Sequence, residues 1–232
     1  MGQTYNPLDK IHLGESVATA LLRKERIALG SLPRTEGAGV YAIYYEGDFA
    51  PYSAMVRHNQ TAELKVPIYV GKAVPKGSRR GGGEATVTST GELVIPITHA
   101  LFNRLVDHAD SIRASTNLKI DDFKCRFLVV DDIWIPLAES VMIARTRPLW
   151  NRVVDGFGNH DPGAGRYQGQ RSQWDTIHPG RAWAAKCRPN SLSQAQIEKL
   201  IRKQMPGLLT PQQPVTVAAV VTGQADGRRR RD

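Results

Sequence analysis

The segment GVYAIYY at residues 39–45 decides the fold of this chain. It is rich in aromatic and β-branched residues, which is typical of a β-strand. Alternate residues of a strand share a face, so its first glycine and Tyr41 point the same way. Residues 68–71, IYVG, predict a second strand in which Tyr69 and Gly71 likewise share a face. If the two strands pair, both phenols would project into one cleft; the alternative is two core tyrosines in ordinary strands.

Apolar periodicity predicts a third strand and four helices around these two strands. The third strand is expected at residues 123–130, and the helices are expected at residues 15–29, 98–115, 136–147 and 193–204. Long connections separate these elements, and the one at 77–91 is rich in glycine. We therefore expect an α+β fold, with a small, mainly antiparallel three-stranded sheet flanked by helices.

We expect the chain to be organised in three parts. They are an N-terminal helical segment at 1–34, a central domain at 35–190, and a C-terminal helix with a disordered basic tail at 191–232. The disorder is expected to begin at Pro206, since proline, glutamine, glycine and arginine dominate from there. Three insertions are candidates for contacting a large ligand, namely residues 47–65, 79–97 and 155–181.

The chain of 232 residues has a net charge of +9. The tail at 226–232 holds four arginines and two aspartates, which leaves +7 on the rest. A basic body suggests a polyanionic partner such as nucleic acid, although a protein with a high pI and no such partner is the alternative. The chain has no run of 18 or more apolar residues, so we expect no membrane span. The polar N-terminus and two distant cysteines favour a cytoplasmic protein without a zinc cluster or disulfide framework.

Two polar residues lie one turn apart on the helix expected at 98–115. Arg104 and His108 stand at i and i+4, on the edge of its apolar stripe. Arginine offers forked donors to a phosphate, and histidine can shuttle a proton near neutral pH. A solvated helix flank is the alternative interpretation.

Glu139 is the single position that is most informative about a metal site. Its helical neighbours Ile135, Met142 and Ile143 are apolar, and a carboxylate there is costly unless it is paired or bound to a metal. One carboxylate together with waters and phosphate oxygens suits Mg²⁺. The alternative is a first-turn glutamate that is favoured by the helix dipole. Asn151, in the sequence Leu-Trp-Asn, indicates no more than a turn when it is taken alone.

The order and spacing of these residues resemble the GIY-YIG nuclease superfamily. The chain reads Gly39-Val40-Tyr41 and Tyr69-Val70-Gly71, and then Arg104, Glu139 and Asn151. Valine replaces isoleucine in both strand motifs, and the strands are farther apart than is usual in the superfamily. That spacing, His108, and the run His178-Pro179-Gly180-Arg181 resemble the branch of type II restriction endonucleases that cut CCGCGG.

The resemblance implies Mg²⁺-dependent hydrolysis of a phosphodiester. Glu139 would hold one Mg²⁺ ion per active site, Arg104 would supply fixed positive charge, and Tyr69 and Asn151 would bind and orient the phosphate. Tyr41, paired with His108, would deprotonate the attacking water. His108 itself and Lys72 remain alternative bases.

The resemblance also implies double-stranded DNA as the substrate, a homodimer on a palindromic GC-rich site, and a cognate methyltransferase that protects host DNA. A non-catalytic nucleic-acid-binding protein and a homing or repair nuclease of the same superfamily are the alternatives. The insertions supply candidates for DNA contacts, namely Lys72, Lys76, Arg79, Arg80, Gln170, Arg171, His178 and Arg181. For the last four, the alternative is that they tether the loop to the protein body.

Overall fold

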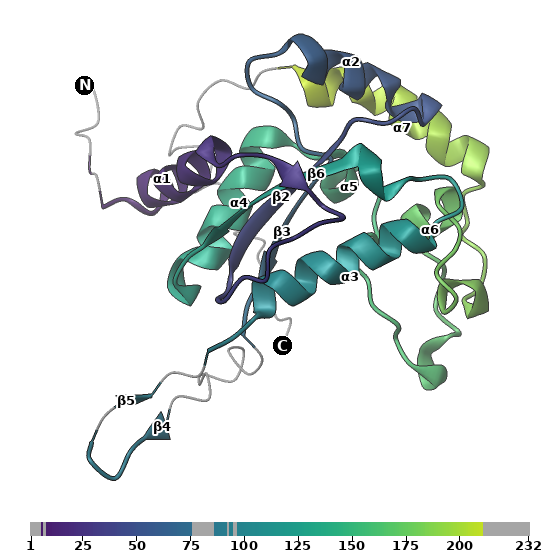
Figure 1. The fold of residues 1–232 in the computed structure, drawn as a ribbon. Coiled ribbons are helices and arrows are strands. Elements are labelled where there is room, and N and C mark those ends of the chain that lie inside the picture. Colours follow the sequence, from purple (N-terminus) through teal and green to yellow (C-terminus); the bar gives the residue numbers. More distant parts are fainter. Residues whose placement is uncertain (1–5, 7, 76–85, 92, 95–96, 211–232) are drawn as a thin grey trace, which may run out of the picture.

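The computed structural model describes residue 6 and residues 8–75, 86–91, 93–94 and 97–210. Its main sheet is antiparallel and has the strand order β1-β6-β2-β3 (Figure 1). The strands are β1 (Ile27–Ala28), β2 (Gly39–Tyr45), β3 (Tyr69–Ala73) and β6 (Phe123–Val129). The α+β class is confirmed. The sheet has four strands instead of the expected three, because the two residues of β1 pair with β6.

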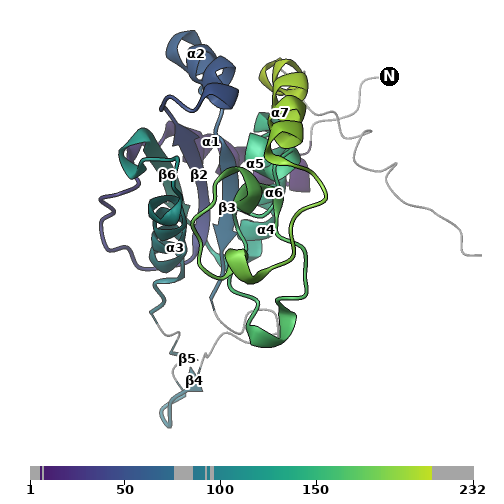
Figure 2. The same cartoon turned by 90° about the vertical axis from the view of Figure 1, so that its right-hand side faces the viewer.

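The helices cover both faces of this sheet (Figure 2). The longer ones are α1 (Lys10–Arg23), α2 (Ser53–Thr61), α3 (Ala100–Ala114), α4 (Ile135–Thr146) and α7 (Gln194–Leu209), and the shorter ones are α5 (Leu149–Arg152) and α6 (Gln173–Ile177). In the part of the chain that the structure describes, no helix is long and apolar enough to cross a membrane.

The central strand β2 is buried over all seven residues and divides the interior into two cores. Tyr41, Ile43 and Tyr45 face one core, which α3, α5, α6 and α7 share. The alternate residues, such as Val40 and Tyr44, face a second core, which α1 and α4 cover. The period of two in a strand therefore places Tyr41 on the α3 side of the sheet.

The first helix differs from the sequence-based prediction of residues 15–29. It begins at Lys10, where the side chain of Asp9 accepts a hydrogen bond from the backbone of Ile11, and it ends at Arg23. Ile27 then pairs with Cys125 in the sheet. The residues between are good helix formers, but pairing with β6 overrides that local preference.

Two further helical stretches also differ from the prediction. The connection at 47–66 contains α2, which packs against α7 (Figure 1). The last helix continues through Pro206 to Leu209, although it was expected to end at residue 204. Met205 and Leu208 extend its apolar stripe into the core, and this burial offsets the hydrogen bond that proline removes.

The insertion at 79–97 is described only in part. Its strands β4 (Thr86–Val87) and β5 (Leu93–Val94) form an antiparallel ribbon that lies away from the main sheet in both views (Figures 1 and 2). Lys76, Arg79 and Arg80 lie outside the described residues, as does the tail from 211.

Candidate active site

Tyr41 and His108 form a hydroxyl–imidazole pair between the sheet and α3. The Tyr41 hydroxyl lies 2.6 Å from Nε2 of His108, and both side chains are buried. Tyr41 is directly opposite Gly71 in the register of β2 and β3. A Cβ atom at position 71 would collide with the Tyr41 hydroxyl. The glycine of the second strand motif is therefore required for the phenol to reach the histidine.

The electrostatics of this pair keep both partners neutral. Burial raises the pKa of Tyr41 well above its usual value; the neighbouring Tyr69 raises it further, while Arg104 lowers it. Burial also lowers the pKa of His108 well below its usual value, and the positive charge of Arg104 adds to that effect. The Tyr41 hydroxyl therefore donates and Nε2 of His108 accepts. The histidine is placed to receive the phenolic proton.

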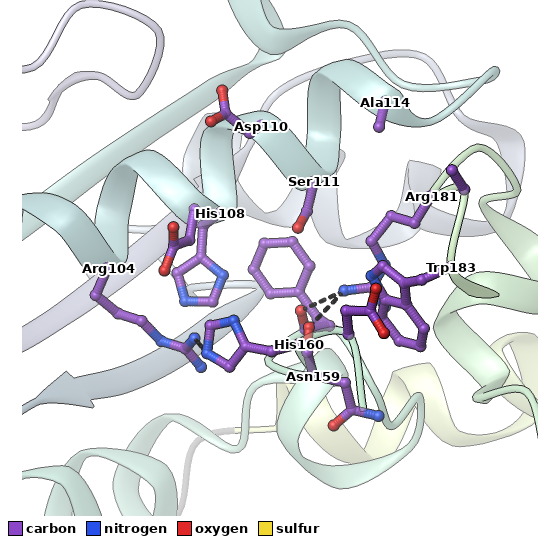
Figure 3. Close-up of a pocket in the computed structure, with 13 residues that line it drawn as sticks. Arg104, His108, Asp110, Ser111, Ala114, Asn159, His160, Arg181 and Trp183 are labelled. Carbon is purple, nitrogen blue, oxygen red and sulfur yellow. Dashed lines mark hydrogen bonds between the residues drawn. The ribbon is translucent and has the colours of Figure 1, made fainter. Parts of the chain in front are cut away.

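Arg104 lies one helical turn before His108 and points to the same place (Figure 3). Its Nη2 donates to the carbonyl of Gly158 at 2.8 Å, and its Nη1 donates to Nε2 of His160. Arg104 also opposes the rise that burial causes in the pKa of Tyr69. Arg104 and His108 therefore lie together on one face of α3, as their spacing of four residues predicts.

Tyr69 completes this cluster from the edge strand β3. Its ring centroid lies 5.2 Å from that of His108 and 6.3 Å from that of Tyr41. The prediction that two paired strands project both phenols into one place therefore agrees with the geometry.

Residues 156–160, which we name the capping segment, close the cluster from the loop after α5. Phe157 stacks on His108 with a centroid distance of 4.5 Å and an interplanar angle of 16°. Gly158 and His160 both contact Arg104. Sequence reasoning missed His160, because a histidine in an irregular loop has no periodicity that would place it.

Arg181 holds the capping segment in place. It donates to both carboxylate oxygens of Asp175, at 2.6 and 2.7 Å, and to the carbonyls of Gly156, Phe157 and Asn159. The guanidinium lies over the rings of Trp174 and Trp183, with distances to the ring centroids of 4.6 and 4.7 Å. Arg181 is therefore buried and engaged with protein partners, so its guanidinium is not available as the expected DNA contact.

His178 is also a core residue and not a DNA contact. Its Nε2 lies 2.6 Å from the Tyr52 hydroxyl and its Nδ1 lies 2.8 Å from Oδ1 of Asn117. Burial lowers its pKa to about 3, so the ring is neutral. Because an amide oxygen only accepts, Nδ1 carries the proton and Nε2 accepts from Tyr52.

The two other candidate DNA contacts in the loop at 155–181, Arg171 and Gln170, have different surroundings. Arg171 donates to the carbonyls of Ala184 and Ala185, at 2.9 and 3.3 Å, which favours the tethering alternative. Gln170 is exposed and forms a backbone bridge with Arg188, so its side chain stays available as a candidate DNA contact.

Asn151 has a different role from the one expected. Its Oδ1 accepts from the backbone N–H of Val70 and its Nδ2 donates to the carbonyl of Val70, both at 2.8 Å. Both ends of the amide are thus bonded to β3. Asn151 holds the strand that carries Tyr69 and Gly71, and this replaces our expectation that it binds phosphate directly.

Glu139 and Lys72 lie at the edge strand β3, on the face of the sheet opposite to Tyr41 and Tyr69. Lys72 is opposite Val40, so it belongs to the face that α4 covers. Its Nζ donates to Oε2 of Glu139 at 2.8 Å, and the carboxylate is half-buried. After burial and Arg104, the charge of Glu139 also acts on the pKa of Tyr69 and raises it. The carboxylate is therefore within electrostatic range of the tyrosine cluster.

The donor set at this edge fits one magnesium ion. Within the described ranges, no group of three His, Cys, Asp or Glu side chains is arranged to hold a metal. Mg²⁺ keeps several waters and takes one or two carboxylates together with substrate phosphate oxygens. Glu139 matches that pattern, so the residues fit an ion that takes most of its ligands from water and substrate.

Two comparisons with known proteins bear on this arrangement. No curated protein matches the chain. The family model described as the Eco29kI GIY-YIG domain, a restriction endonuclease family, matches residues 33–205. The match includes both strand motifs, Arg104, His108, Glu139 and Asn151, and it extends through the capping segment and most of α7. Because it covers about three quarters of the chain, this protein belongs to the Eco29kI family of GIY-YIG restriction endonucleases.

Proposed function

We propose that this nuclease is a type II restriction endonuclease that hydrolyses both strands of DNA at a palindromic GC-rich site, CCGCGG. It uses one Mg²⁺ ion per active site, acts as a homodimer, and has a cognate methyltransferase as its protective partner. The observation that carries the proposal is the Tyr41–His108 pair with the Arg104 guanidinium beside it. A phosphate-binding cation next to a proton relay is what phosphodiester hydrolysis requires.

The proton relay runs from water to tyrosine to histidine. Tyr41 is neutral at pH 7, since burial raises its pKa. It therefore takes a proton from the attacking water only as it passes its own proton to Nε2 of His108, 2.6 Å away. The resulting imidazolium is costly in this buried place beside Arg104. The negative charge of a bound phosphate offsets that cost, which ties base activation to substrate binding.

The negative charge of the phosphate is stabilised from two sides of the site. Arg104 stabilises the equatorial oxygens as charge develops, and the hydroxyl of Tyr69 orients one of them. Glu139 would hold a Mg²⁺ ion, which would supply Lewis-acid polarisation of the scissile phosphate when bound. Lys72, whose ammonium donates to Glu139 in the free protein, holds that carboxylate at the edge of β3. Its donor role makes Lys72 a weaker candidate for the base than the Tyr41–His108 pair.

Base readout has to come from outside this cluster, because His178 and Arg181 are buried. The remaining candidates are Gln170, the insertion at 47–65, and the insertion at 79–97, where β4 and β5 lie away from the main sheet. A palindromic site calls for a two-fold dimer in which each copy reads one half-site.

The test is cleavage of plasmid DNA by the purified protein with Mg²⁺, followed by sequencing of the ends. We expect double-strand breaks at CCGCGG with 5′-phosphate and 3′-hydroxyl ends, and no cleavage by a Glu139→Gln variant that still binds DNA within a few-fold. If the protein binds DNA tightly but does not cleave it with any divalent metal tested, the proposed enzymatic activity is refuted and the non-catalytic alternative is favoured. Cleavage at an unrelated sequence would refute the proposed specificity alone.

A further inference from the structure

The capping segment takes one hydrogen bond from each terminal nitrogen of Arg104, the fork that would bind a phosphate. Nη1 faces Nε2 of His160 (Figure 3), and Nη2 donates to the carbonyl of Gly158. Both terminal amines of the guanidinium therefore have protein partners in the free protein. Since a phosphate is bound through the same fork, substrate must replace or join these partners.

The contact between Arg104 and His160 fixes the protonation state of the imidazole. A guanidinium only donates, so Nε2 of His160 must accept, and the ring is neutral with its proton on Nδ1. A protonated His160 would present a second donor and a second positive charge to Arg104. The two side chains can both stay in place only if an anion comes between them.

The charges that face His160 come from three segments. Burial lowers the pKa of His160, Arg104 lowers it further, Asp107 on α3 raises it, and Arg181 lowers it. The neutral His108 and the carboxylates of Asp110 and Asp161 line the same cavity, which has a volume of about 310 Å³. His160 itself is exposed, so solvent and a ligand can both reach it.

We propose that His160 is a further phosphate-binding residue of this site, which caps Arg104 as a neutral imidazole in the free protein and becomes a protonated second donor when a DNA phosphate binds. The inference rests on the proposed function, and it adds a proton to the binding step. The phosphate oxygen replaces Nε2 as the acceptor for Arg104, and the imidazolium of His160 donates to the same phosphate. DNA binding therefore takes up a proton that comes from solvent.

The experiment measures binding of the full-length protein to a CCGCGG duplex and to a scrambled duplex, in EDTA and at constant ionic strength, between pH 6 and pH 8. Affinity of the wild type should fall with rising pH, by at most about tenfold per unit for one linked proton. His160→Gln can still bond to Arg104 but cannot take up a proton, so its affinity should vary less with pH. Calorimetry in two buffers of different ionisation enthalpy should show proton uptake by the wild type and less by the variant.

The matched control is His58→Ala, which removes a half-buried histidine from α2, far from Arg104 in the sequence and outside the cavity. This variant should keep the wild-type pH curve. If His160→Gln has the same pH dependence and proton uptake as the wild type, the role of His160 is overturned while the nuclease assignment stands. If the wild type binds neither duplex and cuts no plasmid, the proposed function falls, and the role of His160 falls with it.

Discussion

Replacing Arg181 by methionine should destabilise the protein more than any other single arginine substitution among the described ion pairs. The side chain is 5% exposed, and it pairs with an Asp175 that is 2% exposed. The change leaves that carboxylate buried without its cation and leaves three backbone carbonyls, those of residues 156, 157 and 159, without this donor. Breaking a buried pair in this way costs about 3–5 kcal/mol. At roughly 2–4 °C per kcal/mol for a domain of this size, Tm should fall by about 6–20 °C.

The assay is urea unfolding together with thermal melting of wild type and variants. Arg113→Met is the matched control, because its pair with Asp110 is largely exposed and should be worth about 0–1 kcal/mol. The double variant Arg181→Met with Asp175→Leu should recover part of the lost stability, since it leaves no unpaired charge. A destabilisation by Arg181→Met no larger than that by Arg113→Met would refute the claim that Arg181 organises the capping segment.

Three further predictions concern the site and its surroundings. Tyr41→Phe and His108→Ala should each lower single-turnover cleavage by at least ~100-fold, because each breaks the proton relay; a rate within a few-fold of the wild type would remove that residue from the mechanism. The pKa of His178 is lowered to about 3 in the folded protein. Between pH ~6.5 and ~3 the unfolded chain therefore binds a proton at this histidine that the native state excludes. As the pH drops through this range, the free energy of unfolding should fall by up to about 1.4 kcal/mol per pH unit because of His178. Urea unfolding at several pH values should show a shallower acid slope for His178→Gln, and parallel slopes would contradict this account. DNA affinity should fall steeply between ~50 and ~200 mM salt as counterions are released, and a flat response would count against phosphate contacts.

Local periodicity predicts which side chains come together at the centre of the candidate site. Arg104 and His108 come together because residues four apart stack on one face of a helix. Tyr41 and Tyr69 come together because the two strand motifs pair, with Gly71 leaving room for the phenol. These relations depend on spacing within one element or on a single strand pairing, so the sequence contains them.

The remaining roles depend on partners that no local pattern reveals. Asn151 bonds to the backbone of Val70, 81 positions away in the chain. His178 and Arg181 have the chemistry of DNA contacts, and only the tertiary fold shows that they are buried and engaged with protein partners. His160 lies in an irregular loop, and its place on Arg104 follows from how Arg181 fixes the capping segment. Polar residues can therefore be assigned from sequence only when their partners are close along the chain.

The order of the site residues along the chain has a consequence for biosynthesis. Tyr41, Arg104 and His108 leave the ribosome well before Arg181, the residue that holds the capping segment against them. Synthesis proceeds at about 5–20 residues per second, and a domain generally folds as a unit once its residues are available. A nascent chain that ends between residues 160 and 181 therefore contains the candidate site residues of β2 and α3 and the capping segment, but lacks the arginine that holds this segment in place. The capping segment can therefore settle against Arg104 only late in synthesis, after Arg181 has been added.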